Sequence, residues 1–268
     1  MISELKNVEI FESLFNWHIM VEISEKEIET VAKKLNFPLG QDFLFKCSWN
    51  YYRKCTVFSL NRVPLLFFKY VRDDYFFEVL GLHLTINLFD SEMTFRNYLT
   101  GLFKSQKPIP YIITTYEMGV NLSNYNNKDY LFLLGRQCYL HEVLALYDVY
   151  DRHFIVRDKN SLCRIDFGRC FENLQKEYLG FRDYLNNKNI DVSNEEFQKG
   201  YAFEKLKISN NLRDKRIDLI KFIKSISLLE KDYVLIDFEV KKFYERLITY
   251  WKRIGFLKTI KISDSELI

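Results

Sequence analysis

Glycine, proline and uncharged apolar runs are scarce in this sequence. The chain has 268 residues with only 9 glycines and 4 prolines, and this composition argues against disordered, collagen-like or long-linker architectures. No stretch of about 18 apolar residues is without a charge, so we expect no membrane span and no membrane partner. The opening segment, MISELKNVEIFESLF, carries early acidic residues and lacks the pattern of a signal peptide, which predicts a cytoplasmic protein.

Paired cysteines are also lacking. The chain has five cysteines, an odd number, and no two of them have CxxC spacing. A disulfide framework or a zinc site is therefore not expected, and a reducing compartment such as the cytosol is favoured.

Hydrophobic residues, in contrast, make up 48% of the chain and aromatic residues 17%, which is enough for a sizeable core. The helical spacing of apolar residues predicts one or two helices in residues 1–37. Residues 42–71 contain three short β-rich runs, DFLFKCSW, CTVFSL and VPLLFFKYV, with breaks short enough for hairpins. We expect three consecutive antiparallel strands there, a helix over 75–88 and another over 91–104.

The second half of the chain is mostly helical in its pattern. A buried strand, YIITTYEMG, ends at Gly119, and the short strands FIV and LCRID flank the turn RDKNS. Helices are predicted over residues 131–146, 194–208, 213–229 and 237–254. The order predicts an α+β chain with two lobes: a β-rich N-lobe over residues 1–118, with a helical extension over 1–37, and a helical C-lobe over residues 119–268.

The segment that carries chemistry is LYDVYDRHFIVRDKNSLCRIDFGRCF, residues 146–171. His153 follows Asp148 by five residues, and Asp166, which opens the tripeptide DFG, follows Asp148 by 18 residues (166 − 148). This pattern resembles the catalytic core of protein kinases and of their small-molecule relatives. The resemblance implies a bilobal protein-kinase-like fold that binds ATP and transfers its γ-phosphoryl group. Asp148 would orient the acceptor hydroxyl, and Asp166 and His153 would hold a divalent metal.

Upstream residues extend the resemblance over about residues 42–171. Lys69, in the run VPLLFFKYV, matches the strand lysine that contacts the nucleotide phosphates. Glu78 matches the helix glutamate that pairs with this lysine, and Glu92 is a rival for the same role. The passage IITTYEMGVNL is similar to the strand-to-hinge segment that binds adenine, which would place Tyr116, Glu117 and Met118 at the hinge.

Three departures from the family pattern bear on function. His153 stands where the family has a metal-binding Asn, and imidazole suits Mn²⁺ better than Mg²⁺, so either ion is a candidate. The segment CSWNYYRKC lacks the glycines of a phosphate-binding loop. The stretch FENLQKEYLGF, which carries no APE motif, looks more like atypical kinases or aminoglycoside-phosphotransferase-like enzymes. The first two departures motivate an alternative function, a pseudokinase that serves as a nucleotide-binding or interaction module.

A second register of the same segment stays open. Asp151-Arg152-His153 is similar to the DRH motif of lipid-kinase-like and some secreted kinases. In that register Asp151 would be catalytic, and Val156 would stand at the position of the metal-binding Asn. The distance from Asp151 to Asp166 is 15 residues (166 − 151), shorter than in the first register.

The charge is uneven along the chain, although the net charge is only +3. Residues 199–262 contain sixteen Lys or Arg against eight Asp or Glu. This region after Lys199 could attract an anionic partner such as RNA, or it could simply be a solvated helical surface. The acceptor hydroxyl, on a protein or on a small molecule, is not indicated by any motif.

Overall fold

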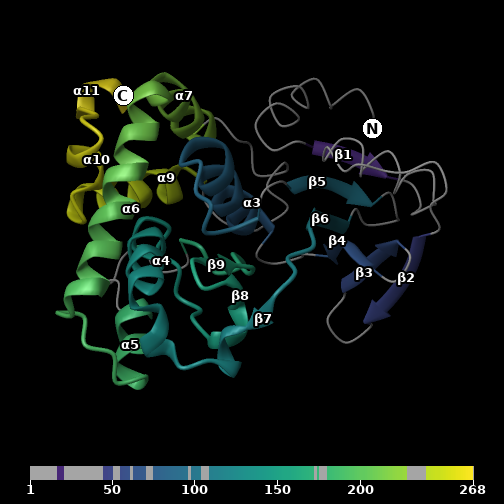
Figure 1. The fold of residues 1–268 in the computed structure, drawn as a ribbon. Coiled ribbons are helices and arrows are strands. Elements are labelled where there is room, and N and C mark those ends of the chain that lie inside the picture. The colour runs from purple at the N-terminus through teal and green to yellow at the C-terminus, as the bar shows by residue number, and fades with distance from the viewer. Residues whose placement is uncertain are drawn as a thin grey trace. The chain divides into compact units, whose positions relative to one another are not determined.

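The structure, a computed structural model, describes residues 17–20, 45–50, 55–60, 63–70, 75–95, 98–103, 109–171, 174, 180–227 and 240–267. Its fold is α+β, as predicted (Figure 1). The chain forms two compact units. We call residues 1–75 and 95–118 the sheet unit, and residues 76–94 and 119–268 the helical unit.

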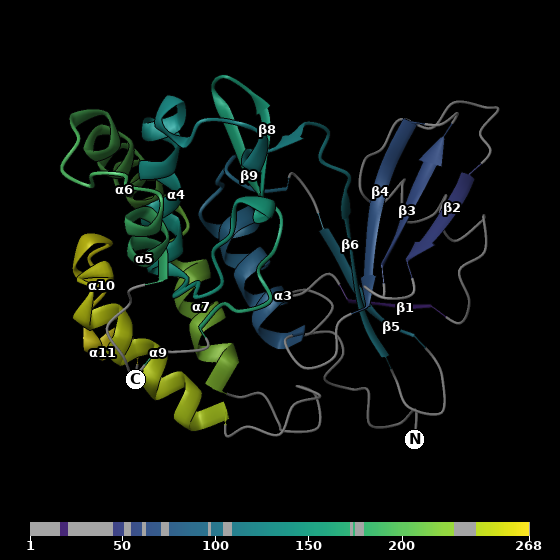
Figure 2. The same cartoon turned by 90° about the horizontal axis from the view of Figure 1, so that it is seen from below.

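The sheet unit contains a six-stranded sheet in the order β1-β5-β6-β4-β3-β2. Its strands are β1 (Trp17–Met20), β2 (Phe45–Asn50), β3 (Cys55–Leu60), β4 (Val63–Tyr70), β5 (Tyr98–Phe103) and β6 (Ile109–Thr115). The three consecutive antiparallel strands predicted over 42–71 are confirmed as β2, β3 and β4, which lie side by side in Figure 2. Leu66 and Phe68 are buried on one face of β4, which places Lys69, half-buried, on the other face.

Two helix predictions in this unit are wrong where the structure describes the residues. Residues 17–20 form β1, which pairs in parallel with β5, whereas the rest of the predicted helical extension lies outside the described residues. Residues 98–103, predicted as part of a helix, form β5, which pairs antiparallel with β6. Tyr98 and Thr100 are both buried, so the two-residue period of a half-buried strand prevails over local helix propensity here.

The helical unit contains α3 (Tyr75–His83, which begins at the unit boundary), α4 (Leu131–Val143), α5 (Gly180–Asn187), α6 (Glu195–Asp214), α7 (Arg216–Ser227), α9 (Val240–Arg253), α10 (Phe256–Thr259) and α11 (Asp264–Leu267). A π-helical turn, Leu84–Leu88, continues α3, and 3-10 turns cover Leu122–Asn124, Asn127–Tyr130 and Asp151–His153. The helices predicted around 131–146, 194–208, 213–229 and 237–254 are confirmed. No helix in this description is long and apolar enough to cross a membrane.

A small antiparallel sheet in the helical unit has the order β7-β8-β9. It consists of β7 (Val120–Asn121), β8 (Phe154–Asp158) and β9 (Ser161–Arg164). The hairpin predicted from FIV, RDKNS and LCRID is confirmed as β8 and β9, which pair from Phe154↔Arg164 to Asp158↔Ser161.

Helix α3 belongs to the helical unit rather than to the sheet. Residues 76–94, predicted as part of the N-lobe, cluster in the structure with residues 119–268. The ring of Phe76 lies 5.6 Å from that of Phe243 on α9, and the ring of His83 stacks on Phe222 of α7 at 4.5 Å. Aromatic packing therefore holds α3 against α7 and α9.

Helices α4 and α6 pack along each other and lie side by side in both ribbon views (Figures 1 and 2). A Cβ atom on Gly135 would lie 2.0 Å from the carbonyl oxygen of Phe197, and one on Gly200 would lie 1.9 Å from that of Phe132. The two glycines therefore permit a backbone approach that any side chain would block.

Candidate active site

The β8–β9 hairpin brings together the two segments that the sequence analysis singled out. Asp148 precedes β8 and Asp166 follows β9, and because the strands are antiparallel, both aspartates lie at the same end of the hairpin. The amide of Ile165 donates to the carbonyl oxygen of His153 at 2.9 Å. This hydrogen bond joins the segment of residues 148–153 directly to the segment of residues 165–168.

His153 and Asp166 face each other at this end of the hairpin. The distance from His153 Nε2 to Asp166 Oδ2 is 3.8 Å, and the side chains are 8% and 35% exposed, respectively. His153 Nδ1 lies 3.3 Å from the carbonyl oxygen of Asp148. Since a carbonyl oxygen only accepts, Nδ1 carries the proton in the neutral ring, and Nε2 turns its lone pair toward Asp166.

The electrostatic surroundings favour this neutral ring. Burial lowers the pKa of His153, and the Arg164 cation lowers it further, while the carboxylates of Asp166 and Asp148 oppose the shift. Arg152 Nε is 3.4 Å from His153 Nε2, a long contact from an exposed side chain whose guanidinium lies over the Tyr150 ring at 4.4 Å. The imidazole is therefore available as a neutral ligand once Arg152 moves.

The carboxylate of Asp166 is oriented by its own turn. Its Oδ1 accepts a hydrogen bond from the Gly168 amide at 3.1 Å, and its Oδ2 is the atom that faces His153. The two oxygens of the carboxylate therefore have different contacts: Oδ1 accepts from the backbone of its own turn, and Oδ2 faces the imidazole.

Asp148 is half-buried, and its backbone is tied to the segment after Asp166. The amide of the preceding residue, Tyr147, lies 3.5 Å from the carbonyl oxygen of Arg169. The structure therefore places Asp148, His153 and Asp166 in one neighbourhood of the helical unit.

Arg164 is the residue of this neighbourhood that the sequence analysis missed. Its guanidinium donates from Nη2 to the carbonyl oxygen of Asp148 and from Nε to that of Asp166, each at 2.6 Å. The side chain is almost fully buried and lies over the Phe154 ring at 5.3 Å. The sequence did carry a signal for Arg164, namely a cation inside the otherwise apolar strand LCRI, two residues before Asp166.

Asp151, the catalytic candidate of the second register, has three side-chain donors. Its Oδ1 accepts from Tyr184 Oη at 2.6 Å and from Asn127 Nδ2 at 3.3 Å, and its Oδ2 accepts from Lys188 Nζ. Burial alone would raise the pKa of Asp151, but these hydrogen bonds and the Lys188 charge lower it overall. This carboxylate ties the turn before β8 to α5.

Glu78 lies in the helix that packs on the Asp166 segment. A Cβ on Gly81, one turn further along α3, would lie 2.4 Å from Cys170 Sγ and 3.3 Å from Phe167 Cδ1. Burial raises the pKa of the Cys170 thiol; Arg164 opposes this, and the charges of Glu78 and Asp166 add to it. Glu78, itself buried, thus shares the surroundings of Cys170 with Asp166.

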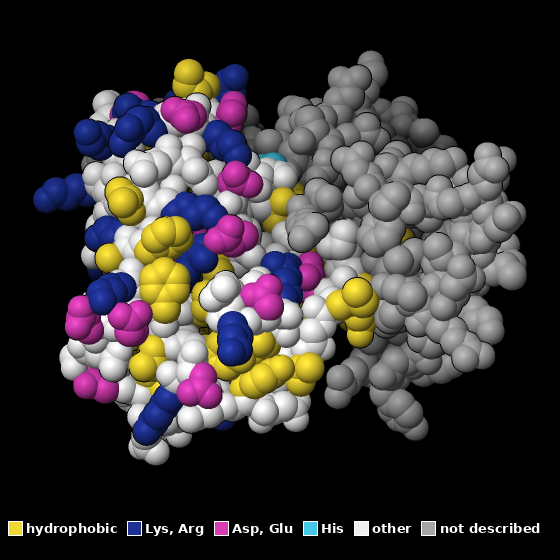
Figure 3. Space-filling model, viewed as in Figure 1, with side chains coloured by type: hydrophobic (Ala, Val, Ile, Leu, Met, Phe, Trp, Pro, Cys, Tyr) yellow, Lys and Arg dark blue, Asp and Glu magenta, His cyan; other side chains and the backbone are white. Residues whose placement is uncertain are grey.

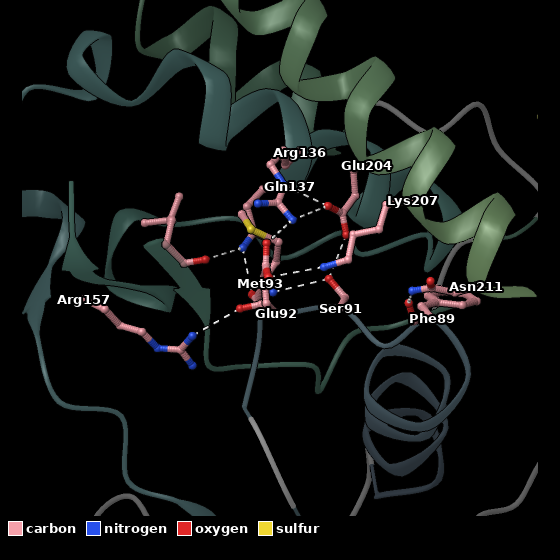
Figure 4. A network of polar contacts seen from close by, with 11 residues as sticks. Phe89, Ser91, Glu92, Met93, Arg136, Gln137, Arg157, Glu204, Lys207 and Asn211 are labelled. Carbon is pink, nitrogen blue, oxygen red and sulfur yellow. Dashed lines mark hydrogen bonds and ion pairs between the residues drawn. The ribbon is translucent and has the colours of Figure 1, made fainter. Parts of the chain in front are cut away.

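Glu92, the rival of Glu78, is engaged in a different network (Figure 4). Its carboxylate pairs with Arg136 at 2.8 Å and with Lys207 at 3.4 Å. Arg136 also pairs at 2.7 Å with the fully buried Glu204, which accepts a further hydrogen bond from Ser91 at 2.8 Å. The network fixes residues 91–94 to α4 and α6.

The remaining candidates belong to the sheet unit. Lys69 lies on β4, opposite Cys55 of β3 and Ile112 of β6. Tyr116, Glu117 and Met118 follow β6 at the end of this unit, where Tyr116 and Met118 are exposed. The glycine-free segment between β2 and β3, residues 51–54, lies outside the described residues.

His153 and Asp166 in the helical unit are close enough to bind one metal ion as a pair of ligands. Two ligands each about 2.1 Å from one ion can be up to about 4 Å apart, and His153 Nε2 and Asp166 Oδ2 are 3.8 Å apart. Within the described ranges, no group of three or more His, Cys, Asp or Glu side chains converges. The pair fits an ion whose other ligands come from water and from phosphate oxygens.

The basic region after Lys199 lies partly on the exposed face of α9. Lys241, Lys242, Arg246, Lys252 and Arg253 are exposed there beside one exposed acid, Glu245. On the face of the helical unit seen in Figure 3, however, Lys and Arg side chains are interspersed with Asp and Glu. An anionic partner for this region stays a prediction.

No protein-family model matches the chain, and no curated protein matches it significantly. The case for a function therefore rests on the residues at the end of the β8–β9 hairpin.

Proposed function

We propose that the chain is an ATP-dependent phosphotransferase that acts on a hydroxyl group, and that its chemistry takes place at Asp148 and Asp166. The observation that carries the proposal is the neighbourhood of Asp148, His153 and Asp166 at one end of the β8–β9 hairpin. A loop carboxylate, a metal-ligand pair and a connecting hairpin are the parts that phosphoryl transfer requires of this half of a kinase-like enzyme.

Each residue has a stated role in the proposal. The Asp148 carboxylate accepts a hydrogen bond from the acceptor hydroxyl, aligns its oxygen with the γ-phosphorus and receives the proton as the new P–O bond forms and the bond to the ADP oxygen breaks. Asp166 and His153 hold a divalent cation, which supplies positive charge against the phosphate oxygens. The contacts of Lys69, Glu78 and residues 116–118 with the nucleotide phosphates and the adenine stay predictions that follow from the resemblance.

The structure favours Asp148 over Asp151 as the catalytic carboxylate. Asp151 accepts hydrogen bonds from Tyr184 of α5, from the buried Asn127 and from Lys188, which directly follows α5. Recruiting Asp151 to a substrate hydroxyl would break these bonds, and each hydrogen bond to a charged group is worth about 1.5–3 kcal/mol. The first register needs no such rearrangement.

The alternative function is a pseudokinase that binds nucleotide or a protein without turnover. Its support is the sequence CSWNYYRKC, which has no glycine between β2 and β3, and the imidazole at position 153. The phosphotransferase and a nucleotide-binding pseudokinase both predict a nucleotide site, and they differ in phosphoryl transfer.

A thermal-shift titration followed by a transfer assay separates these functions. The wild type is heated with ATP in the presence of Mg²⁺, of Mn²⁺ and of chelator. A ligand present at 100 times its dissociation constant adds about 2.7 kcal/mol to stability, so a clear metal-dependent shift is expected. Release of ADP with labelled phosphate on an acceptor supports the enzyme, and a shift without turnover supports the pseudokinase. No shift with either metal contradicts both.

A further inference from the structure

We propose that Arg164 is the positioning residue that holds the Asp148 and Asp166 segments in a single geometry. This inference rests on the proposed function, because it assigns Arg164 a role in arranging that same site. Arg164 does not act on substrate directly in this account. It acts through the backbone carbonyls of the two aspartates.

The bond geometry supports a bridge. Arg164 Nη2 is 2.6 Å from the carbonyl oxygen of Asp148, and Arg164 Nε is 2.6 Å from that of Asp166. Hydrogen bonds from a charged donor are short and about twice as strong as neutral ones. A planar guanidinium fixes the angle between its N–H groups, so two bonds to two segments also fix how those segments lie relative to each other.

The base of this bridge is itself held in place. The Arg164 amide donates to the Met93 carbonyl oxygen at 2.8 Å, and Thr94 Oγ1 donates to the Arg164 carbonyl oxygen at 3.2 Å. The side chain is only 1% exposed, and the Phe154 ring lies beneath the guanidinium. Backbone anchoring and burial leave the guanidinium little freedom to move away from the two carbonyls.

The bridge also reaches the metal-ligand pair. The carbonyl oxygen of Asp148 that accepts from Arg164 also lies 3.3 Å from His153 Nδ1. One oxygen atom therefore connects Arg164 to the orientation of the imidazole. If the Asp148 carbonyl shifts, His153 loses the contact that aims Nε2 at Asp166.

A second arginine of the same hairpin provides a matched control. Arg157 on β8 also donates to two carbonyl oxygens, from Nη1 to Glu92 at 3.1 Å and from Nη2 to Thr94 at 2.8 Å. These acceptors lie in residues 91–94 and not in the two aspartate segments. Arg157→Lys therefore tests the loss of a double hydrogen bond from an arginine while both guanidinium bonds of Arg164 to the aspartate segments stay in place.

The experiment compares hydrogen exchange in the wild type, Arg164→Lys, Arg164→Met and Arg157→Lys. Lysine keeps the charge but presents one ammonium in place of a fork, and methionine removes all donors. We expect the amides of His153, Ile165 and Gly168 to exchange at least roughly tenfold faster in Arg164→Lys, as expected for the loss of one charged hydrogen bond. Arg164→Met should show at least the same effect, and Arg157→Lys should leave these amides unchanged. If Arg164→Met does not fold, Arg164→Lys decides.

A Mn²⁺ titration of the same folded variants adds a readout that a merely structural role would not move. The Mn²⁺ concentration that gives half of the maximal response should rise several-fold in Arg164→Lys. In Arg157→Lys this concentration should stay at the wild-type value. The inference is overturned if the three amides of Arg164→Lys exchange at the wild-type rate. It is also overturned if the exchange rate rises uniformly over the whole chain. Equal Mn²⁺ midpoints for the two lysine variants overturn it while the proposed function stands. If the wild type responds to neither Mn²⁺ nor Mg²⁺, the proposed function fails, and the exchange rates alone decide whether Arg164 is the bridge.

Discussion

His153 Nε2 and Asp166 Oδ2 lie 3.8 Å apart, although thirteen residues (166 − 153) separate them in the chain. The β8–β9 hairpin accounts for this proximity, because Phe154 pairs with Arg164 and the Ile165 amide bonds to the His153 carbonyl. The pair can offer a metal one nitrogen and one oxygen ligand. This combination leads to the first prediction.

His153→Asn should change which metal supports nucleotide binding. An imidazole nitrogen suits Mn²⁺ and later transition metals, whereas an amide oxygen suits Mg²⁺. We expect the wild type to be stabilised by ATP more strongly with Mn²⁺ than with Mg²⁺, and His153→Asn to reverse or equalise that order. Thermal shift with each metal measures this, and Asp166→Asn should abolish the response to both. An unchanged metal order in His153→Asn would remove His153 from the metal site.

Asp148→Asn should abolish transfer and spare nucleotide binding. An amide keeps the shape of the side chain but cannot accept the proton of the hydroxyl, and general-base catalysis typically contributes about 10²–10⁴-fold. Initial rates of ADP release measure the loss, with ATP-dependent thermal shift as the binding control. Asp158→Asn is the matched variant, since Asp158 is exposed at the hairpin turn, where its side chain accepts from the Asn160 amide. A fully active Asp148→Asn variant would exclude Asp148 as the catalytic residue.

Asp151→Asn should destabilise the chain without abolishing transfer. The hydrogen bonds from Lys188, Tyr184 and Asn127 hold the pKa of Asp151 below its ordinary value. A depressed carboxyl pKa contributes stability at pH values above the unfolded pKa, and this contribution is lost as the pH falls through the folded pKa. We expect about 1–3 kcal/mol lower stability at pH 7, measured by urea unfolding, and a variant–wild-type difference that shrinks in acid.

The same variant decides between the two registers. Assayed at a temperature at which it is folded, Asp151→Asn should retain most of its transfer rate if Asp148 is catalytic. Loss of transfer by more than about 10²-fold, the minimum expected of a missing general base, would instead favour the Asp151 register.

Arg136→Met should cost far more stability than Glu92→Gln. Removing Arg136 leaves the fully buried Glu204 carboxylate with Ser91 as its hydrogen-bond donor, and breaking a buried pair typically costs about 3–5 kcal/mol. Glu92 is 62% exposed, so its loss should cost about 1 kcal/mol or less. Chemical unfolding of both variants tests this. If Arg136→Met and Glu92→Gln lose the same free energy of unfolding, the Arg136–Glu204 pair does not anchor residues 91–94.

His83 should make stability fall in mild acid. Burial lowers the pKa of His83 to about 4 from 6.5, so the unfolded chain binds this proton at a higher pH than the folded chain does. The neutral His83 ring therefore makes its full contribution to the free energy of unfolding above pH 6.5. This contribution, about 3 kcal/mol in all, is lost as the pH falls toward 4. His83→Phe keeps a ring against Phe222 and should flatten this part of the pH profile. The pKa of the buried His141 is also lowered, so it adds a pH dependence of stability that is the same in the wild type and in His83→Phe.

The sequence predicted the hairpin and its flanking residues because their signals are local. Short β-branched runs around a polar turn indicate β8 and β9, and the residues on either side of a hairpin must lie close together. Strand β5 was missed because the residues around Thr94–Leu102 carry no clear two-residue alternation, and pairing with β6 decides their conformation.

Partners that are distant in the sequence could not be predicted. Glu204 is 68 residues from Arg136 (204 − 136), and Tyr184 is 33 residues from Asp151 (184 − 151). The acceptors of Arg164 are backbone carbonyl oxygens, which every residue has, so no residue type marks them. Side-chain motifs therefore indicated Asp148, His153 and Asp166 as candidates, and the contacts that orient them became visible only in three dimensions.

Other segments contact both strands of the β8–β9 hairpin. Strand β7 pairs with β8 through Val120 and Asn121, and the segment at Met93 and Thr94 bonds to Arg164 of β9. The hairpin tip, where Lys159 and Asn160 are exposed, is therefore a suitable place for added residues. An epitope tag or a fluorophore-bearing loop grafted at Lys159–Asn160 would report on this hairpin without entering it.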